Sequence, residues 1–196
     1  MNKKVGKLSL SCFVSSHGFG HASRVAAVIQ SLSQKVQNLD LLIFGETTEW
    51  FWRLNLPRDG CTYEFVHAKT DVGLFQNGPF AHDLKKTLKE VEDFLSFSSQ
   101  EFNMCRNALI KHRPHLVLCD ISPLGIILAK EVDIPVLILE NFTWDWIYQA
   151  YEKEDSGFRK IISSLHQIYS EVDYLILDQD LHHLNSNLHY FYNKWE

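Results

Sequence analysis

The sequence predicts an α/β fold, a Rossmann-like three-layer sandwich with a mostly parallel sheet. Two observations predict it. Short apolar segments rich in β-branched and aromatic residues alternate with longer amphipathic segments. The apolar segments are also continuous, which is typical of strands that helices cover on both faces. The length of 196 residues suits one domain with a sizeable core.

The expected elements follow one another along the chain without a linker or an internal repeat. Pro114 and Pro135 mark connections from helix to strand, and Asp83 is placed to cap a helix that begins at Leu84. A glycine- and proline-containing loop is expected at residues 69–80. We therefore assign residues 1–178 to one Rossmann-like domain and 179–196 to a C-terminal tail, either a packed helix or the remnant of a truncation. The expected strands are 8–14, 39–45, 62–68, 115–120, 135–140 and 172–178, and the expected helical stretches are 22–35, 46–54, 81–112, 124–132 and 157–170.

Charge and composition exclude several classes of function. The formal net charge is −5, and adjacent lysines occur only at 3–4 and 85–86, so nucleic acid is not an expected partner. No apolar stretch approaches the about 18 residues that span a bilayer, and the apolar start is too short for a signal peptide, so we expect a cytoplasmic protein without a transmembrane segment. The four cysteines form no C-x-x-C pair, and we expect no metal site and no cofactor. Cys12 and Cys119 lie in expected strands and are interpreted as small buried apolar residues.

The strongest local motif is the segment SSHGFGHASR at residues 15–24, between the first strand and the first helix. Glycines at such a turn let a ligand approach the backbone, and the first N–H groups of the helix favour phosphate or a polar sugar. Ser23 stands where the dinucleotide fingerprint needs its third glycine, so that fingerprint is absent. The alternative is a polar turn with two solvated histidines. The expected ligand-binding residues of the motif are His17, Gly18, Phe19, Gly20 and Arg24.

A carboxylate ends a strand at the same edge of the predicted sheet. Asp120 closes the strand 115–120, and parallel topology places it beside His21, at the start of the first helix. A carboxylate that accepts the Nδ1–H of a histidine fixes its tautomer, so that Nε2 can remove a proton from a hydroxyl group. The pair His21 and Asp120 is thus the predicted catalytic site. The alternative is that Asp120 only caps the following helix.

A third segment, ENFTWDWIY at residues 140–148, follows the fifth strand at this edge. Aromatic rings stack on the apolar faces of sugars, while amide and carboxylate groups bind hydroxyls. Asn141, Trp144 and Asp145 are therefore expected substrate-binding residues. The alternative is that Trp144 and Trp146 serve core or interdomain packing.

The motifs HGFGHASR (17–24) and DISPLGIILAKEVDIPVLILENFTWDWIYQAY (120–151) resemble the amino-terminal domain of GT-B glycosyltransferases. The likeness is to the glycosyltransferase-like region fused to plant L-arabinokinases and, more distantly, to MurG and the plant UDP-glycosyltransferases. It covers roughly residues 8–178. It implies that His21 is the catalytic base, that Asp120 orients it, and that Gly18 and Gly20 face the donor diphosphate. The implied reaction is an inverting, metal-independent transfer to a sugar or glycosylated acceptor.

The family places its nucleotide-sugar site mainly in a second, C-terminal Rossmann domain of roughly 150–200 residues. This chain stops at Glu196. We therefore expect the acceptor-binding half of a nucleotide-sugar-dependent glycosyltransferase, inactive without a C-terminal donor-binding domain or subunit. The alternatives are a non-catalytic sugar- or nucleotide-binding regulatory module and a truncated gene product. The sequence also leaves open which of His17 and His21 faces the cleft.

Overall fold

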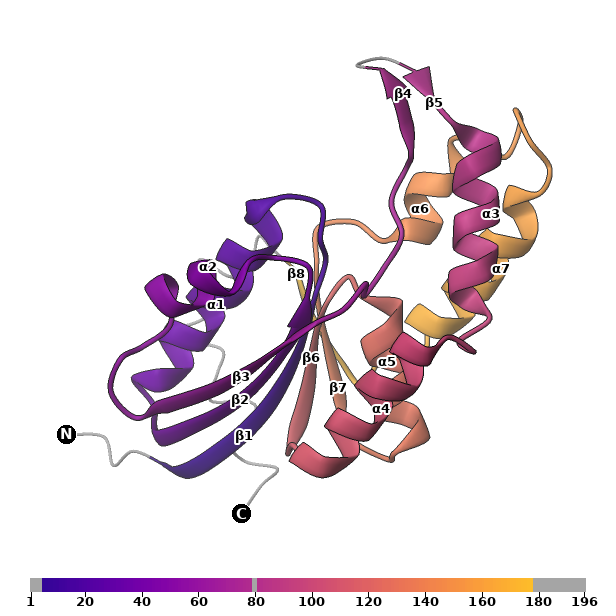
Figure 1. Ribbon diagram of the computed structural model, residues 1–196. Coiled ribbons are helices and arrows are strands. Elements are labelled where there is room, and N and C mark those ends of the chain that lie inside the picture. Colours follow the sequence, from indigo (N-terminus) through magenta and orange to yellow (C-terminus); the bar gives the residue numbers. More distant parts are fainter. Residues whose placement is uncertain (1–4, 79–80, 178–196) are drawn as a thin grey trace.

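The computed structural model describes residues 5–78 and 81–177. Its main sheet has six strands in the order β3-β2-β1-β6-β7-β8, and every neighbouring pair is parallel (Figure 1). This confirms the predicted α/β fold with its Rossmann-like sheet. The predicted tail, 179–196, lies outside the described residues. The strands are β1 (Val5–Val14), β2 (Val36–Gly45), β3 (Cys61–His67), β6 (Leu116–Asp120), β7 (Val136–Glu140) and β8 (Tyr174–Leu177).

Helices cover both faces of this sheet, as the continuous apolar strands require. Side chains alternate along β1, so Cys12 and Val14 pack into one core cluster, under α1 (Phe19–Ser33) and α2 (Glu49–Asn55). Phe13 points the other way, into a second cluster under α4 (Gln100–His112) and α5 (Pro123–Glu131). The expected burial of Cys12 and Cys119 is confirmed, and burial raises the pKa of both thiols.

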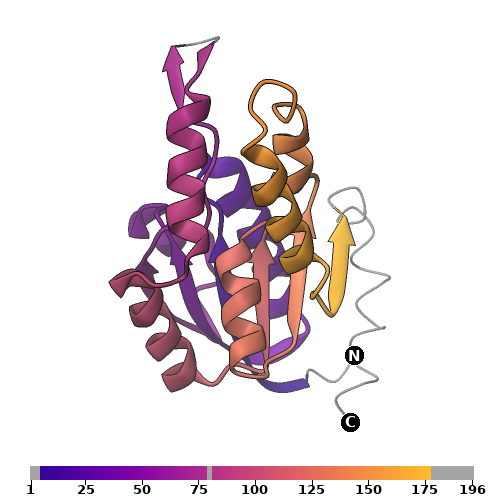
Figure 2. The ribbon, with the colours of Figure 1, turned by 90° about the vertical axis from the view of Figure 1, so that its right-hand side faces the viewer.

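A smaller layer projects beyond the carboxyl ends of the strands (Figures 1 and 2). It contains α3 (Leu84–Leu95), α6 (Trp144–Gln149) and α7 (Phe158–Tyr169), together with an antiparallel hairpin of β4 (Gln76–Gly78) and β5 (Ala81–His82). Its own apolar cluster is built around Tyr148 and Phe158, which are fully buried. We call this layer the overhang, since it stands over the edge at which the predicted site lies.

The structure corrects two details of the predicted elements. The stretch 81–112 is not one helix. Helix α3 ends at Leu95, Phe97 adopts a left-handed φ of 47°, and α4 begins at Gln100. Ser99 then starts α4 by accepting the Phe102 N–H at 3.0 Å. Ala81 belongs to β5 rather than to a helix. The expected loop at 69–80 contains the other strand of the hairpin, β4 (Gln76–Gly78). Asp83 does cap α3, by accepting the Lys86 N–H at 3.0 Å.

The helices of the described residues are short or amphipathic. Across 5–78 and 81–177, none is long and apolar enough to cross a membrane.

The core of the sheet sets the stability of the fold, so a cavity in β7 should be costly. Ile138 is 1% exposed, and Ile138→Ala is expected to lower the free energy of unfolding by about 2–5 kcal/mol through lost burial and the cavity left behind. Leu54 in α2 is 70% exposed, and Leu54→Ala should change the free energy of unfolding by less than about 0.5 kcal/mol. Urea unfolding of both variants measures the difference, and similar costs would contradict the described packing.

Candidate functional site

The candidate site lies where three strands of the sheet end. Val14, the last residue of β1, is paired in register with Asp120, the last residue of β6, so the glycine turn begins directly beside that carboxylate. In the next strand, Leu139 is paired with Asp120, and Glu140 follows it. The carboxyl edge of an open α/β sheet is where such folds bind ligands.

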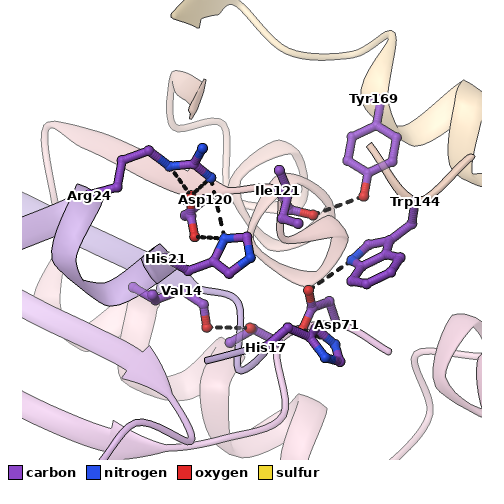
Figure 3. Close-up of polar contacts among 10 residues, drawn as sticks. Val14, His17, His21, Arg24, Asp71, Asp120, Ile121, Trp144 and Tyr169 are labelled. Carbon is purple, nitrogen blue, oxygen red and sulfur yellow. Dashed lines mark hydrogen bonds and ion pairs between the residues drawn. The ribbon is translucent and has the colours of Figure 1, made fainter. Parts of the chain in front are cut away.

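Asp120 is the centre of this edge. Its side chain is fully buried, and it accepts a hydrogen bond from His21 Nδ1 at 2.7 Å (Figure 3). Its other oxygen accepts from Arg24 Nε at 2.8 Å and also contacts Arg24 Nη2. His21 and Arg24 lie three residues apart on α1 and so share one face of that helix. The sequence grouped Arg24 with the substrate-binding residues, whereas the structure engages it with Asp120 and leaves its side chain only 8% exposed.

The geometry assigns the proton on His21. The Asp120 carboxylate is an acceptor, so in the neutral imidazole His21 Nδ1 carries the hydrogen and Nε2 has the lone pair. Arg24 Nη2 also lies 3.3 Å from His21 Nδ1. With Nδ1 protonated, Arg24 Nη2 and His21 Nδ1 both carry hydrogens, so neither accepts a hydrogen bond from the other. What remains is an imidazole whose Nε2 is available as a base.

The alternative role for Asp120, a helix cap, is taken by another residue. Ser122 is the N-cap of α5, and its Oγ accepts the Gly125 N–H at 3.3 Å. Between them, Ile121 adopts a φ of 50°, a conformation rare for a β-branched residue. The Tyr169 hydroxyl of α7 donates to the Ile121 carbonyl oxygen at 2.8 Å and helps to hold this turn (Figure 3).

The glycine turn leaves the start of α1 without a side-chain cap. Gly18 is the N-cap residue with a φ of 89°, which glycine adopts without strain, and the first turn contains no acidic residue. The N–H groups of that turn are therefore suited to a ligand's oxygen atoms. Around Gly20 a Cβ atom would meet nothing within 4 Å, so protein packing does not require that glycine. Phe19 is 53% exposed and packs on Trp50 and Phe51 of α2.

The structure also brings in Asp71, which sequence analysis did not single out. Asp71 is fully buried and accepts the Trp144 Nε1–H at 2.8 Å through Oδ2, while Oδ1 lies 3.8 Å from His17 Nε2 (Figure 3). Burial raises the pKa of Asp71, and the charges of His17 and His21 and the hydroxyl of Ser15 act in the opposite direction. The site thus contains two histidine–carboxylate pairs, one on each side of the glycine turn.

Two hydrogen bonds fasten the Asp71 loop to the sheet. Thr70 Oγ1 donates to the Val14 carbonyl oxygen at 2.7 Å, and Ser122 Oγ donates to the Thr70 carbonyl oxygen at 2.9 Å. A loop between strand and hairpin offered no periodicity that would place Asp71. The available signal was a carboxylate in KTDVG, a few residues after the end of an expected strand.

The aromatic segment after β7 only partly matches its predicted role. Trp144 is 5% exposed and stacks on Tyr148 with ring centroids 5.8 Å apart, so it is not an open platform for a sugar. Instead its indole N–H holds Asp71. Trp146 is 65% exposed, and Asn141 is exposed as well. Phe142 is half-buried and stands edge-on to the His21 ring at 6.1 Å.

Two further carboxyl groups, those of Glu140 and Asp145, lie near each other at this edge of the sheet, with Arg24 near Glu140. Asp145 is buried and lies 3.2 Å from His166 Nδ1 through Oδ2, while its Oδ1 has no hydrogen-bond partner among the described residues. Glu140 is half-buried, and burial followed by the charge of Asp145 raises its pKa, against the opposing charge of Arg24. Across residues 5–78 and 81–177, no three His, Cys, Asp or Glu side chains gather closely enough to hold a metal ion.

Known proteins share this fold. UGT2 of Phytolacca americana, solved with UDP-2fluoro-glucose and pterostilbene, matches with a TM-score of 0.51 and 13% identity over 86% of this chain and 47% of its own. UGT89C1 of Arabidopsis thaliana, solved with UDP-L-rhamnose, matches with a TM-score of 0.54 and 13% identity over 90% of this chain and 45% of its own. The chain therefore has the Rossmann-like fold of one half of a GT-B glycosyltransferase.

In sequence, the chain is similar to the L-arabinokinase of Arabidopsis thaliana, with 24% identity over 172 residues. That similarity covers 86% of this chain and 16% of the kinase. No family model matches the chain. The chain thus spans a small part of this relative and less than half of the glycosyltransferases it resembles in structure.

The burial of Asp71 predicts a pH dependence of stability. Its pKa is raised on folding, so the native state binds its proton more tightly than the unfolded chain does. The resulting stability is fully present below the unfolded-state pKa of about 4 and is lost as pH rises through the folded-state pKa. Replacing Asp71 by Asn removes this contribution, so the free energy of unfolding of Asp71→Asn relative to wild type should rise with pH.

Urea unfolding of wild type and Asp71→Asn, from below pH ~4 up to neutral pH, measures the effect. Asp59→Asn, at an exposed position beside the opposite edge of the sheet, is the control for a one-unit change of net charge. A difference that falls with pH would contradict the prediction.

Proposed function

We propose that this chain is the acceptor-binding half of an inverting, metal-independent glycosyltransferase that uses a nucleotide-sugar donor. The observation that carries the proposal is the hydrogen bond of 2.7 Å between His21 Nδ1 and the buried Asp120, which leaves Nε2 as a base at the carboxyl edge of the sheet. The fold adds support, because structures of the same fold were solved with UDP-sugars.

The reaction follows from this arrangement. His21 Nε2 removes the proton of an acceptor hydroxyl while the oxygen forms a bond to the anomeric carbon of the donor sugar. The bond from that carbon to the nucleotide diphosphate breaks on the opposite face, so the configuration inverts. Asp120 stabilises the imidazolium that forms, and Arg24 keeps Asp120 in place.

Binding of the nucleotide-sugar donor needs protein groups other than the site residues described above. We propose that a C-terminal donor-binding domain or a separate subunit binds the nucleotide and that this half is inactive without it. The uncapped start of α1, at Gly18 and Gly20, then faces the diphosphate and offsets its charge without a metal ion. The acceptor is a sugar or a glycosylated molecule. We also place the protein in the cytoplasm, since all four of its cysteines are free.

A second candidate function is a non-catalytic module that senses a sugar or a nucleotide. The observation that favours it is the uncapped start of α1, whose N–H groups suit the phosphate oxygens of a nucleotide without any catalytic step. Calorimetry with UDP, UDP-sugars and free sugars separates the two proposals. Tight nucleotide binding by this chain alone favours the sensor, whereas sugar binding with weak nucleotide binding favours the acceptor-binding half.

Loss of the base should abolish most of the transfer. With the donor-binding partner present, His21→Ala is expected to lower kcat for transfer from UDP-sugars by about 10²- to 10⁴-fold, the usual contribution of a general base. His82→Ala, an exposed histidine of the hairpin, is the control and should leave kcat unchanged. Full activity of His21→Ala would refute the assigned role, and no transfer by wild type with any UDP-sugar would favour the sensor.

A further inference from the structure

The two histidines of the glycine turn face their carboxylates through different nitrogens. His21 meets Asp120 through Nδ1 at 2.7 Å. His17, on the other side of the turn, meets Asp71 through Nε2 at 3.8 Å. Figure 3 shows both rings at this edge, each turned toward its own carboxylate. The nitrogen left over is therefore Nε2 in His21 and Nδ1 in His17.

The bonding needs of Asp71 assign the proton on His17. Asp71 Oδ2 accepts from Trp144, whereas Oδ1 is buried and has no hydrogen-bond partner among the described residues. Buried acceptors are almost always satisfied, and a carboxylate oxygen accepts two hydrogen bonds. Ser15 and His17 are the groups that face this oxygen. Ser15 Oγ is itself buried without a partner among the described residues and can donate to one lone pair of this oxygen. The second lone pair is left for an Nε2–H on His17, which approaches to 3.8 Å, longer than a hydrogen bond, and keeps its lone pair on Nδ1.

The position of His17 is built by the protein around it. A Cβ atom on Gly73 would lie 2.1 Å from His17 Cε1, so only glycine at 73 leaves room for this imidazole. On another side, Trp144 stands edge-on to the ring with centroids 4.9 Å apart. The side chain nevertheless remains 40% exposed. Residues from the turn, the Asp71 loop and α6 therefore hold a ring that still reaches solvent.

We propose that His17 is a second acceptor-contacting residue, which determines specificity by accepting a hydrogen bond from a second hydroxyl of the substrate. This inference rests on the proposed function and deepens it. His21 Nε2 receives the hydroxyl that reacts, and His17 Nδ1 receives one that does not. The ligand class is a polyol, a sugar with two hydroxyls placed to donate to both rings. His17 binds and orients, and the proton transfer stays with His21.

The proton assignment is tested first, without any assay of activity. Long-range proton–nitrogen NMR of ¹⁵N-labelled protein distinguishes the tautomers of neutral histidines, and His17→Ala and His21→Ala assign the signals. We expect His21 as the Nδ1–H tautomer and His17 as the Nε2–H tautomer. In Asp71→Asn, the amide oxygen keeps the Trp144 bond and its NH₂ group donates to His17 Nε2, so His17 should switch to Nδ1–H while His21 is unchanged.

Controls separate this switch from a general disturbance of the fold. Asp59→Asn should alter neither ring, and the unchanged His21 signal shows that Asp71→Asn is folded. Gly73→Ala provides a second variant, which displaces the His17 ring and leaves both carboxylates in place. It should remove the preference of His17 for one tautomer. A His17 tautomer that ignores both Asp71→Asn and Gly73→Ala would overturn the assignment.

The contact with substrate is tested with the transfer assay and with singly deoxygenated analogues of the acceptor sugar. His17→Gln should raise KM for the parent sugar about three- to tenfold, the usual weight of one hydrogen bond, with kcat unchanged. One analogue should show the same rise with wild type and no further rise with His17→Gln.

The outcomes distinguish this inference from the proposed function. Activity that depends on His21 but not on His17 leaves the proposed function standing and overturns the inference. If no transfer is found, calorimetry with the same sugars measures Kd in place of KM. Equal affinities of wild type and His17→Gln would then overturn the proposed contact between His17 and the sugar.

Discussion

The candidate site depends on one interaction, the ion pair between Asp120 and Arg24 at the end of β6. A carboxylate with no solvent exposure is costly unless it is paired and hydrogen-bonded, and the guanidinium together with His21 supplies both conditions. Because Arg24 and His21 lie on one face of α1, this pairing also fixes how the first turn of the helix meets the sheet. The uncapped first turn of α1 and the second ring nitrogen of His21 are thereby held at the edge of the sheet.

The overhang stands over this edge of the sheet and supplies part of the site (Figure 1). The Asp71 loop leaves β3, bonds to Val14 at the end of β1, and then joins the overhang, where the Tyr148 hydroxyl donates to the Val72 carbonyl oxygen at 2.6 Å. Trp144 belongs to α6 of the same layer and holds Asp71. One histidine–carboxylate pair therefore belongs to the sheet, and the other bridges the sheet and the overhang. The overhang contacts the first pair as well, since Tyr169 of α7 donates to the carbonyl oxygen of Ile121, next to Asp120.

Sequence reasoning succeeded where strand ends decide position. Continuous apolar strands predicted a parallel sheet, and a parallel sheet places Asp120 and the turn before His21 side by side. It did not find Asp71, because a loop has no period that fixes where its side chains lie. It assigned Trp144 to a sugar platform, since an aromatic residue near a site suits a core and a ligand equally, and only burial decides between them. The contact of Arg24 with Asp120 was not foreseen for a similar reason, because the two residues lie about one hundred positions apart along the chain.

The charges of the site bear on what it binds. Arg24 is engaged with Asp120, which leaves Asp71, Glu140 and Asp145 as carboxyl groups without a lysine or arginine partner in any ion pair of the described residues. Burial raises the pKa of Asp71 and of Glu140, as expected where negative charge is poorly compensated. Carboxyl groups without a cationic partner disfavour an anionic acceptor and suit neutral hydroxyl groups, which donate hydrogen bonds to acceptors. A negatively charged diphosphate is better accommodated at the uncapped start of α1, whose partial positive charge lies in the backbone. The two ends of the glycine turn thus favour ligands of different charge, which is consistent with the proposed transfer from a charged donor to a neutral sugar.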